Sequence, residues 1–142
     1  MMHPRHELER EYAVRVRGVL AEEQTARLLS GIQLEDGIAR CGSVSSEGGE
    51  GANRWYRIVL KEGRNRIVRR LFDAVGLSIS RLMRVRYGPV ALPPRLRRGQ
   101  ILELAPADVR ELLAALGLPA PRPRAARGSP GTRRHRRAFR AR

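Results

Sequence analysis

The chain has 142 residues, which is the length of a single domain. It carries 29 Lys and Arg against 14 Asp and Glu, a formal net charge of +15, and Cys41 is its only cysteine. An internal disulfide and a cysteine-based zinc site are therefore excluded. No apolar run approaches the roughly 20 residues of a membrane span, and the charged N-terminus does not read as a signal peptide. We expect a cytoplasmic protein with its cysteine reduced. The net charge makes an anionic polymer the first partner to consider, and we expect no membrane partner.

The positive charge is unevenly distributed. Residues 119–142 hold nine arginines and no acid, in a stretch of Pro, Ala, Gly and Arg without periodicity. Such a segment cannot bury apolar surface, so we expect a disordered Arg-rich tail that acts as a solubilising or non-specific RNA-attracting arm. Residues 1–118 have ordinary apolar content and are expected to form the folded part.

The first third of the chain alternates between strand and helix patterns. Residues 11–17 place Tyr12, Val14 and Val16 on one face, which predicts a half-buried strand. Residues 21–30 are helix formers with acids in the first turn. Residues 32–44 surround an Asp-Gly turn signal and are predicted to form two short strands or a ribbon.

The middle of the chain continues the alternation. Residues 45–53 are rich in Gly and Ser and predict a mobile loop, whereas residues 54–60 are β-branched and aromatic and predict a strand. Apolar residues then recur at helical spacing, with Asn65 as the expected N-cap and Gly76 as the stop. The apolar positions of this helix are Ile67, Val68, Leu71, Phe72 and Val75.

The last third predicts two more strands and a helix. In the strand over 79–87, alternation places Met83, Val85 and Tyr87 on one face and Leu82, Arg84 and Arg86 on the other. An extended loop over 88–98 leads to a last strand over 99–104, and Pro106 then suits the first turn of a helix. The stripe that this helix is expected to bury consists of Val109, Leu112, Leu113 and Leu116. The whole order predicts a small α+β or mixed α/β domain.

Basic side chains are densest at the junction between the strand over 54–60 and the helix that follows. Arg64, Arg66, Arg69 and Arg70 gather there, and a helix N-terminus itself attracts anions. The cluster fits two interpretations. One is a site that binds a phosphate backbone or an active-site carboxylate, and the other is a basic helix face exposed to solvent. Arg81, Arg84 and Arg86 form a second basic row, and the interleaved aromatics suit either base stacking or the sheet core. These aromatics are Tyr12, Trp55, Tyr56 and Tyr87.

No catalytic constellation is visible in the local sequence. Asp36, Asp73 and Asp108 are far apart, the serines have no histidine partner, and the GGEG stretch lacks the Lys-Ser/Thr of a phosphate loop. The histidines do not cluster with carboxylates. We therefore expect no metal and no small-molecule cofactor.

Three segments of the chain, taken in order, resemble one known family. The run EGRNRIVRRLFDAVGLSISRLMRVRYGPVALP, the following RRGQILEL and the opening HPRHELEREYAVRV are similar to the bacterial ribosomal RNA pseudouridine synthases, especially the type called synthase B, which acts on the large subunit. The resemblance covers about residues 2–115 and implies the C-terminal part of the catalytic domain, with a mainly antiparallel sheet and flanking helices.

The resemblance implies roles for particular residues. The family isomerises uridine to pseudouridine in ribosomal RNA without a cofactor, using a carboxylate at the sugar, a ring against the flipped base and a cation that orients the carboxylate. The ring is that of Tyr12 and the cation is Arg69, the second arginine of Gly-Arg-x-x-x-x-Arg, while Leu82 lies beside the target base. The expected RNA contacts are Arg64, Asn65, Arg66, Arg70, Arg81, Arg84 and Arg86.

The chain departs from the family pattern in three ways. The Gly-Arg-Leu-Asp motif with the catalytic aspartate is missing, as is the family's N-terminal RNA-binding domain; Ile67 also replaces a usual polar residue. We therefore expect a fragment, inactive alone and monomeric, with an open sheet edge that makes it marginally stable and prone to aggregation. The alternative is a non-catalytic basic RNA-binding remnant. A basic structural ribosomal protein fits the charge but would leave the ordered motifs as coincidence.

Overall fold

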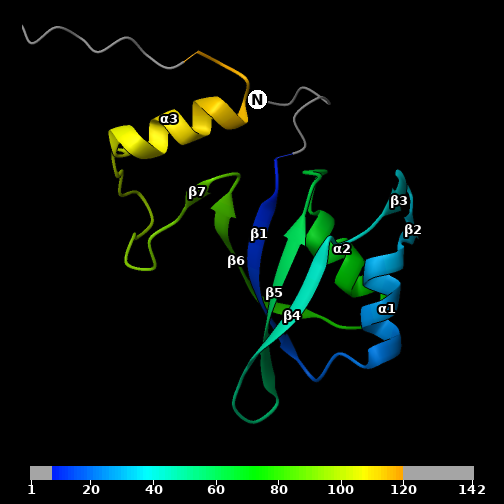
Figure 1. The fold of residues 1–142 in the computed structure, drawn as a ribbon. Coiled ribbons are helices and arrows are strands. Elements are labelled where there is room, and N and C mark those ends of the chain that lie inside the picture. The colour runs from blue at the N-terminus through cyan, green and yellow to red at the C-terminus, as the bar shows by residue number, and fades with distance from the viewer. Residues whose placement is uncertain (1–7, 120–142) are drawn as a thin grey trace, which may run out of the picture.

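The computed structural model describes residues 8–119, which form an α+β fold (Figure 1). Its elements, in chain order, are β1 (Arg10–Arg17), α1 (Glu22–Ser30), β2 (Ile32–Leu34), β3 (Gly37–Ala39), β4 (Ser43–Gly48), β5 (Asn53–Leu60), α2 (Ile67–Ala74), β6 (Ile79–Tyr87), β7 (Val90–Ala91) and α3 (Pro106–Ala115). The expected α+β class with a mainly antiparallel sheet and flanking helices is confirmed. The predicted tail over 119–142 lies almost entirely outside the described residues.

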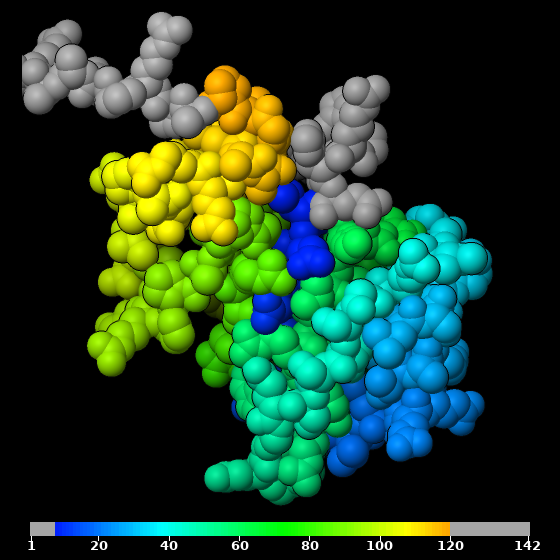
Figure 2. Space-filling model, in the orientation of Figure 1, coloured from blue at the N-terminus to red at the C-terminus, as the bar shows by residue number. Residues whose placement is uncertain are grey.

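The main sheet has five strands in the order β4-β5-β1-β6-β7, and every pairing is antiparallel. The short hairpin of β2 and β3 forms a separate two-stranded sheet. Helices α1 and α2 lie on the same side of the main sheet, whereas α3 lies apart, near the end of the sheet where β7 is found (Figure 1). The residues after β7 form a projection of their own in the space-filling view (Figure 2).

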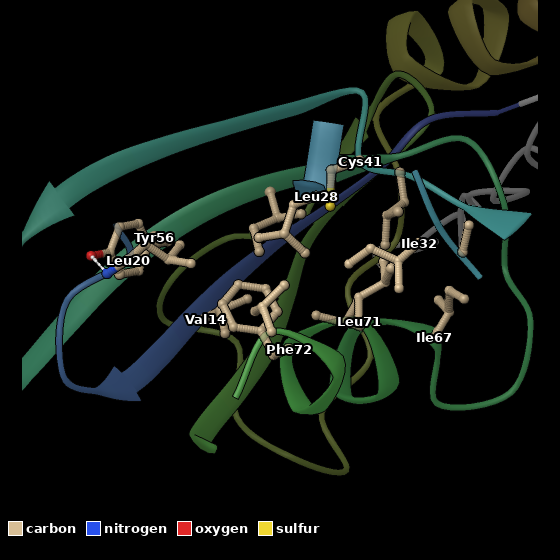
Figure 3. Close-up of a cluster of buried hydrophobic side chains, with 14 of the residues drawn as sticks. Val14, Leu20, Leu28, Ile32, Cys41, Tyr56, Ile67, Leu71 and Phe72 are labelled. Carbon is tan, nitrogen blue, oxygen red and sulfur yellow. Dashed lines mark hydrogen bonds between the residues drawn. The ribbon is translucent and has the colours of Figure 1, made fainter. Parts of the chain in front are cut away.

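The core lies between the sheet and the two helices α1 and α2 (Figure 3). Val14 at the centre of β1 has no exposed surface and stands opposite Tyr56 of β5 and Leu82 of β6. Leu71 and Phe72 of α2 are fully buried against this face. The β-branched and aromatic residues that favour strands thus also supply the apolar face that the helices cover.

Polar contacts fix α1 within this arrangement. The backbone N–H of Leu20 donates to the buried Tyr56 hydroxyl at 2.9 Å, just before the helix begins. Gln24 accepts from the Ala21 N–H at 2.8 Å and donates to the Val75 carbonyl at the end of α2, at 2.7 Å. One side chain therefore caps α1 and ties it to α2, because its amide both accepts and donates.

A bulge in β6 overturns the expected alternation of that strand. Glu11 pairs with Arg86 but Tyr12 pairs with Arg84, so Val85 is the extra residue. Residues opposite each other share a face, and a bulge reverses the alternation beyond it. Tyr87, which pairs with Arg10, therefore shares a face with Arg84 and not with Met83. Arg86, which pairs with Glu11, lies on the other face, so the predicted faces of Tyr87 and Arg86 were both wrong.

Three further predictions about local structure were wrong. Residues 45–48, predicted to belong to a mobile loop, are part of β4, because backbone hydrogen bonds to β5 suffice to order this Ser- and Gly-rich segment. Residues 99–104 form no strand; Ile101 is 96% exposed and has no neighbouring strand to pair with. The N-cap of α2 is Arg66 and not Asn65, because the turn extends one residue further and Arg66 adopts a left-handed backbone with φ 50°.

Helix α3 begins at Pro106 as predicted, but its apolar stripe is not buried. Val109, Leu112, Leu113 and Leu116 are all only half-buried, because α3 does not pack on the core of the sheet and helices. Within residues 8–119 no helix is long and apolar enough to cross a membrane. The same residues contain no group of His, Cys, Asp and Glu that could hold a metal.

Candidate nucleic-acid interface

Tyr12 and Leu82 are brought together by the pairing of β1 with β6. Tyr12 stands opposite Arg84 and Val14 opposite Leu82, so Tyr12 and Leu82 are diagonal neighbours on the helix side of the sheet. Both are half-buried and pack against the core cluster. The strand register thus brings these two predicted site residues side by side on one face.

Arg69 is held by the first residue of β6. It lies in the first turn of α2, is half-buried, and donates from Nη1 to the carbonyl of Ile79 at 3.2 Å. Among residues 8–119 no carboxylate lies within ion-pair distance of its guanidinium group. Arg69 is therefore a positioned cation with remaining N–H groups able to bind an acid or a phosphate.

Arg64 and Arg70, two of the expected RNA contacts, both bind Asp36 in the β2–β3 turn. Arg70 contacts both Asp36 oxygens, and Arg64 Nη1 lies 3.1 Å from Oδ1. The hydrogen bond from Arg70 is the main reason why the pKa of Asp36 falls from its ordinary 3.8 to about 2. The pair of guanidinium groups is thus neutralised in part by a carboxylate 28 and 34 residues away in sequence.

The Arg64 side chain also binds the backbone of the β2–β3 hairpin. Its guanidinium donates to the carbonyls of Asp36, Gly37 and Ile38 at 3.1, 3.3 and 2.8 Å, and its Nε contacts Glu62. Together with the Asp36 carboxylate, five carbonyl and carboxylate acceptors surround its five N–H donors. The main work of Arg64 in this structure is to attach the hairpin to the start of α2.

Arg86 takes part in a ladder of charges on the opposite face of the sheet. Its Nε lies 2.6 Å from Glu11, which also accepts from Arg57 at 3.0 Å. Glu9 binds Arg86 and Glu47 binds Arg57, so the ladder runs from β4 to the segment before β1. The hydrogen bond from Arg86 is the largest cause that holds the pKa of Glu11 below its ordinary 4.5.

The remaining expected contacts have no carboxylate partner among residues 8–119. Arg66, Arg81 and Arg84 are exposed and form no ion pair there, and Asn65 is exposed in the turn before α2. The structure therefore divides the seven expected RNA contacts into two groups. Arg64, Arg70 and Arg86 hold the protein together, whereas the other four are available to a ligand.

Sequence reasoning missed three residues that organise this region, namely Arg10, Glu11 and Asp36. Arg10 donates to the carbonyls of Leu8 and Lys61, at 2.9 and 3.2 Å. The only local signal for Arg10 and Glu11 was their place beside Tyr12. No local signal could show the contacts of Asp36, because they join segments distant in sequence.

The single cysteine has no role in the chemistry that these residues suggest. Cys41 is buried beside a shallow hollow of about 450 Å³ that is lined by Leu29, Arg40, Gly42, Lys61 and Glu62. Burial raises the pKa of its thiol to about 12, so the thiol stays protonated near neutral pH. Cys41 acts as a small apolar core residue.

The fold is that of part of a pseudouridine synthase. A solved structure described as "Crystal structure of pseudouridylate synthase" superposes with a TM-score of 0.64 at 27% identity, over 77% of this chain and 46% of the other. No family model matches the sequence.

Curated relatives identify the group within that class. "Ribosomal large subunit pseudouridine synthase B" of Salmonella typhimurium is 51% identical over 119 residues, and the protein of that name from Escherichia coli K12 is 50% identical over 119. The namesake from Yersinia pestis is 55% identical over 104 residues. This similarity confirms the resemblance that the sequence motifs predicted. The matched region includes 84% of this chain. The chain spans 41% of the length of the Salmonella and Escherichia relatives.

Proposed function

We propose that this chain is the tyrosine- and arginine-bearing part of an enzyme that isomerises uridine to pseudouridine in large-subunit ribosomal RNA. The observation that carries the proposal is the identity of about half over 119 residues with synthases of that name. It is supported by the β1–β6 register, which makes Tyr12 and Leu82 neighbours on one face. No small-molecule cofactor or metal takes part, and the protein works in the cytoplasm as a monomer.

The proposed reaction needs the uracil base to leave the RNA stack. The Tyr12 ring then packs against the base, with Leu82 as its apolar neighbour. Both side chains are half-buried against the core, so little side-chain entropy is lost when the base arrives. They hold the base in position while its bond to the sugar is broken and a carbon bond is made.

Arg69 orients the carboxylate that acts at the sugar. Its Nη1 contact with the Ile79 carbonyl fixes the guanidinium while leaving N–H groups for a carboxylate. None of the acids among residues 8–119 pairs with Arg69. The proposal therefore gives the nucleophile to a part of the enzyme that these residues do not supply, and this chain has no turnover by itself.

RNA is bound chiefly by the cations that have no carboxylate partner. Arg66, Arg81 and Arg84 contact phosphates, with Asn65 beside them, and Arg64, Arg70 and Arg86 contribute to the surrounding field. The proposed folded unit is residues 1–118, and the Arg-rich residues 119–142 add affinity without sequence preference.

A chimera with a relative tests the proposal. The 119 residues of the Escherichia coli K12 synthase that match this chain are replaced by the matching residues of this chain. Pseudouridine formed in a large-subunit ribosomal RNA stem–loop is then measured. We expect an active chimera, and we expect Tyr12→Ala and Arg69→Met to lower kcat by at least about 100-fold, in the range for groups that act in the transition state.

The non-catalytic alternative makes a different prediction for the same protein. An RNA-binding remnant gives a folded chimera that binds RNA and forms no pseudouridine. Full activity of the Tyr12→Ala and Arg69→Met chimeras contradicts the site assignment even where the chimera itself is active. RNA binding alone does not distinguish the two functions, because both require salt-sensitive binding.

A further inference from the structure

Three side chains cluster at the end of the β1–β6 pair, near the segment before β1. The guanidinium carbon of Arg10 lies 5.0 Å from the centre of the Tyr87 ring, and that of Arg84 lies 5.3 Å from the same ring. Both distances are those of cation–π contacts, which orient a guanidinium group against an aromatic face. One tyrosine thus holds two arginines.

The bulge at Val85 creates this cluster. Arg84 and Tyr87 are three residues apart, and in a regular strand they would point to opposite faces. The register shift places both on the face of Arg10 and Tyr12. Bulges commonly re-aim side chains next to functional sites. Here the bulge brings the Tyr87 ring to the face that carries Tyr12 and both arginines.

The cluster is firmly built. Arg10 is fixed by two backbone carbonyls, of Leu8 and Lys61, and crosses the backbone at Gly63. A Cβ at Gly63 would lie only 3.0 Å from Arg10 Nε, so the glycine leaves room for the guanidinium group. The backbone next to Tyr87 is fixed, because the N–H of Gly88 donates to the Glu9 carbonyl at 2.7 Å.

The cluster carries uncompensated positive charge. Within residues 8–119 neither Arg10 nor Arg84 has a carboxylate within ion-pair distance, whereas Arg86 on the other face is bound to both Glu9 and Glu11. Two like charges beside one half-buried ring repel each other unless an anion joins them. A phosphate group, which accepts hydrogen bonds from guanidinium forks, fits this need.

We propose that Arg10 and Arg84 bind the backbone phosphate of the nucleotide that flanks the target uridine, and that Tyr87 positions both. This subsite rests on the proposed function, because Tyr12 marks the place of the target base. Arg10 and Tyr12 are alternate residues of one strand, about 7 Å apart, a span that one nucleotide of extended RNA covers. RNA is favoured over an acidic peptide because the cluster adjoins an aromatic ring suited to a base.

The test measures binding of the full chain to a fluorescent single-stranded oligouridylate over a range of salt concentrations. Each single-strand phosphate contact contributes about 0.7 to the slope of log affinity against log salt. We expect Arg10→Gln and Arg84→Gln each to lower the slope by about 0.7 and the affinity by about fivefold at 0.1 M salt. The matched control, Arg27→Gln, removes the same charge from an exposed position on α1 and is expected to change the slope far less.

Tyr87 is tested as a positioning residue. Tyr87→Phe keeps the ring and should bind as the wild type does, whereas Tyr87→Leu should weaken binding. In a protein that already carries Arg10→Gln and Arg84→Gln, Tyr87→Leu should cause no further loss of RNA affinity, because the ring acts only through the two arginines. Additive losses would instead assign Tyr87 a contact of its own and overturn its positioning role.

The subsite is overturned if Arg10→Gln and Arg84→Gln, both shown to be folded by circular dichroism, have the same slope of log affinity against log salt as the control Arg27→Gln. It is also overturned if they weaken binding to poly-glutamate as much as binding to RNA. If Arg10→Gln does not fold, the exposed Arg84→Gln carries the test. In an active chimera the same substitutions should raise KM and spare kcat; unchanged KM there refutes the subsite alone. A different outcome separates the two proposals. If the chimera is inactive while the glutamine substitutions still lower the salt slope of RNA binding by this chain, the proposed function is refuted and the phosphate site stands.

Discussion

Replacement of Glu11 by Gln tests whether the charge ladder holds β1 and β6 in the register that places Tyr12. Glu11 has 19% of its side chain exposed and accepts from Arg86 at 2.6 Å and from Arg57 at 3.0 Å. A hydrogen bond to a charged group is worth about 1.5–3 kcal/mol when well shielded, but Arg57 is 36% exposed and the amide keeps one acceptor. We expect a loss of about 1–2 kcal/mol in the free energy of unfolding, or about 4–8 °C in Tm.

Urea unfolding of the wild type and Glu11→Gln at several pH values measures this contribution. The pKa of Glu11 is lowered in the folded state from its ordinary 4.5, so its stabilising effect is fully present above that pH. It is lost as the pH falls through the folded pKa, where protonated Glu11 resembles Gln. The stability difference between the two proteins should therefore shrink in acid. Other titrating groups, Asp36 included, are common to both proteins and cancel.

Glu103→Gln is the matched control, since Glu103 is exposed and forms no ion pair among the described residues. It should unfold as the wild type does at every pH. The reasoning fails if Glu11→Gln is as stable as Glu103→Gln at pH 7. It fails equally if the deficit of Glu11→Gln is the same at pH 7 and in acid, because a pH-independent loss is not electrostatic.

Three further substitutions test separate contacts. Tyr56→Phe leaves the buried Leu20 N–H without its acceptor and should cost about 1–3 kcal/mol in urea unfolding, with an unchanged m-value. Arg66→Gly removes the strain of a left-handed side-chain-bearing residue and should raise stability by about 1 kcal/mol while weakening RNA binding; Arg66→Ala should weaken binding without the gain. Asp36→Asn should lower Tm at pH 6, and the difference from wild type should vanish between pH 3.8 and about 2, where native Asp36 protonates.

The strands and helices with strong side-chain periodicity could be predicted from the sequence. β1, β5, α1 and α2 each bury one face, and burial is what periodicity records. β4 could not be predicted, because nearly all its side chains are exposed and only its backbone binds β5. The false strand over 99–104 is the converse case, since apolar alternation without a partner strand gives no ladder.

The site could be predicted only as a set of residue types. The arginine cluster was evident, but which arginines are already bound to acids depends on contacts between distant segments, such as Asp36 with Arg70. Likewise, the faces of β6 followed from alternation only up to the bulge at Val85, which no residue pattern announced. Register and pairing are properties of the sheet, and one extra residue moves a side chain to the other face.

The open edge of β6 carries the last prediction. β6 pairs with β7 only at Arg86 and Tyr87, so residues 79–84 have a strand on one side alone within the described chain. Met83 is 38% exposed along this edge. Unpaired, apolar strand edges favour association between copies, and a charge on the edge opposes it. Met83→Lys should therefore reduce concentration-dependent light scattering, whereas Leu118→Lys, which adds the same charge outside the sheet, should not. Equal improvement by both would mean that net charge and not the edge governs association, and a wild type that stays monomeric at all concentrations would remove the premise.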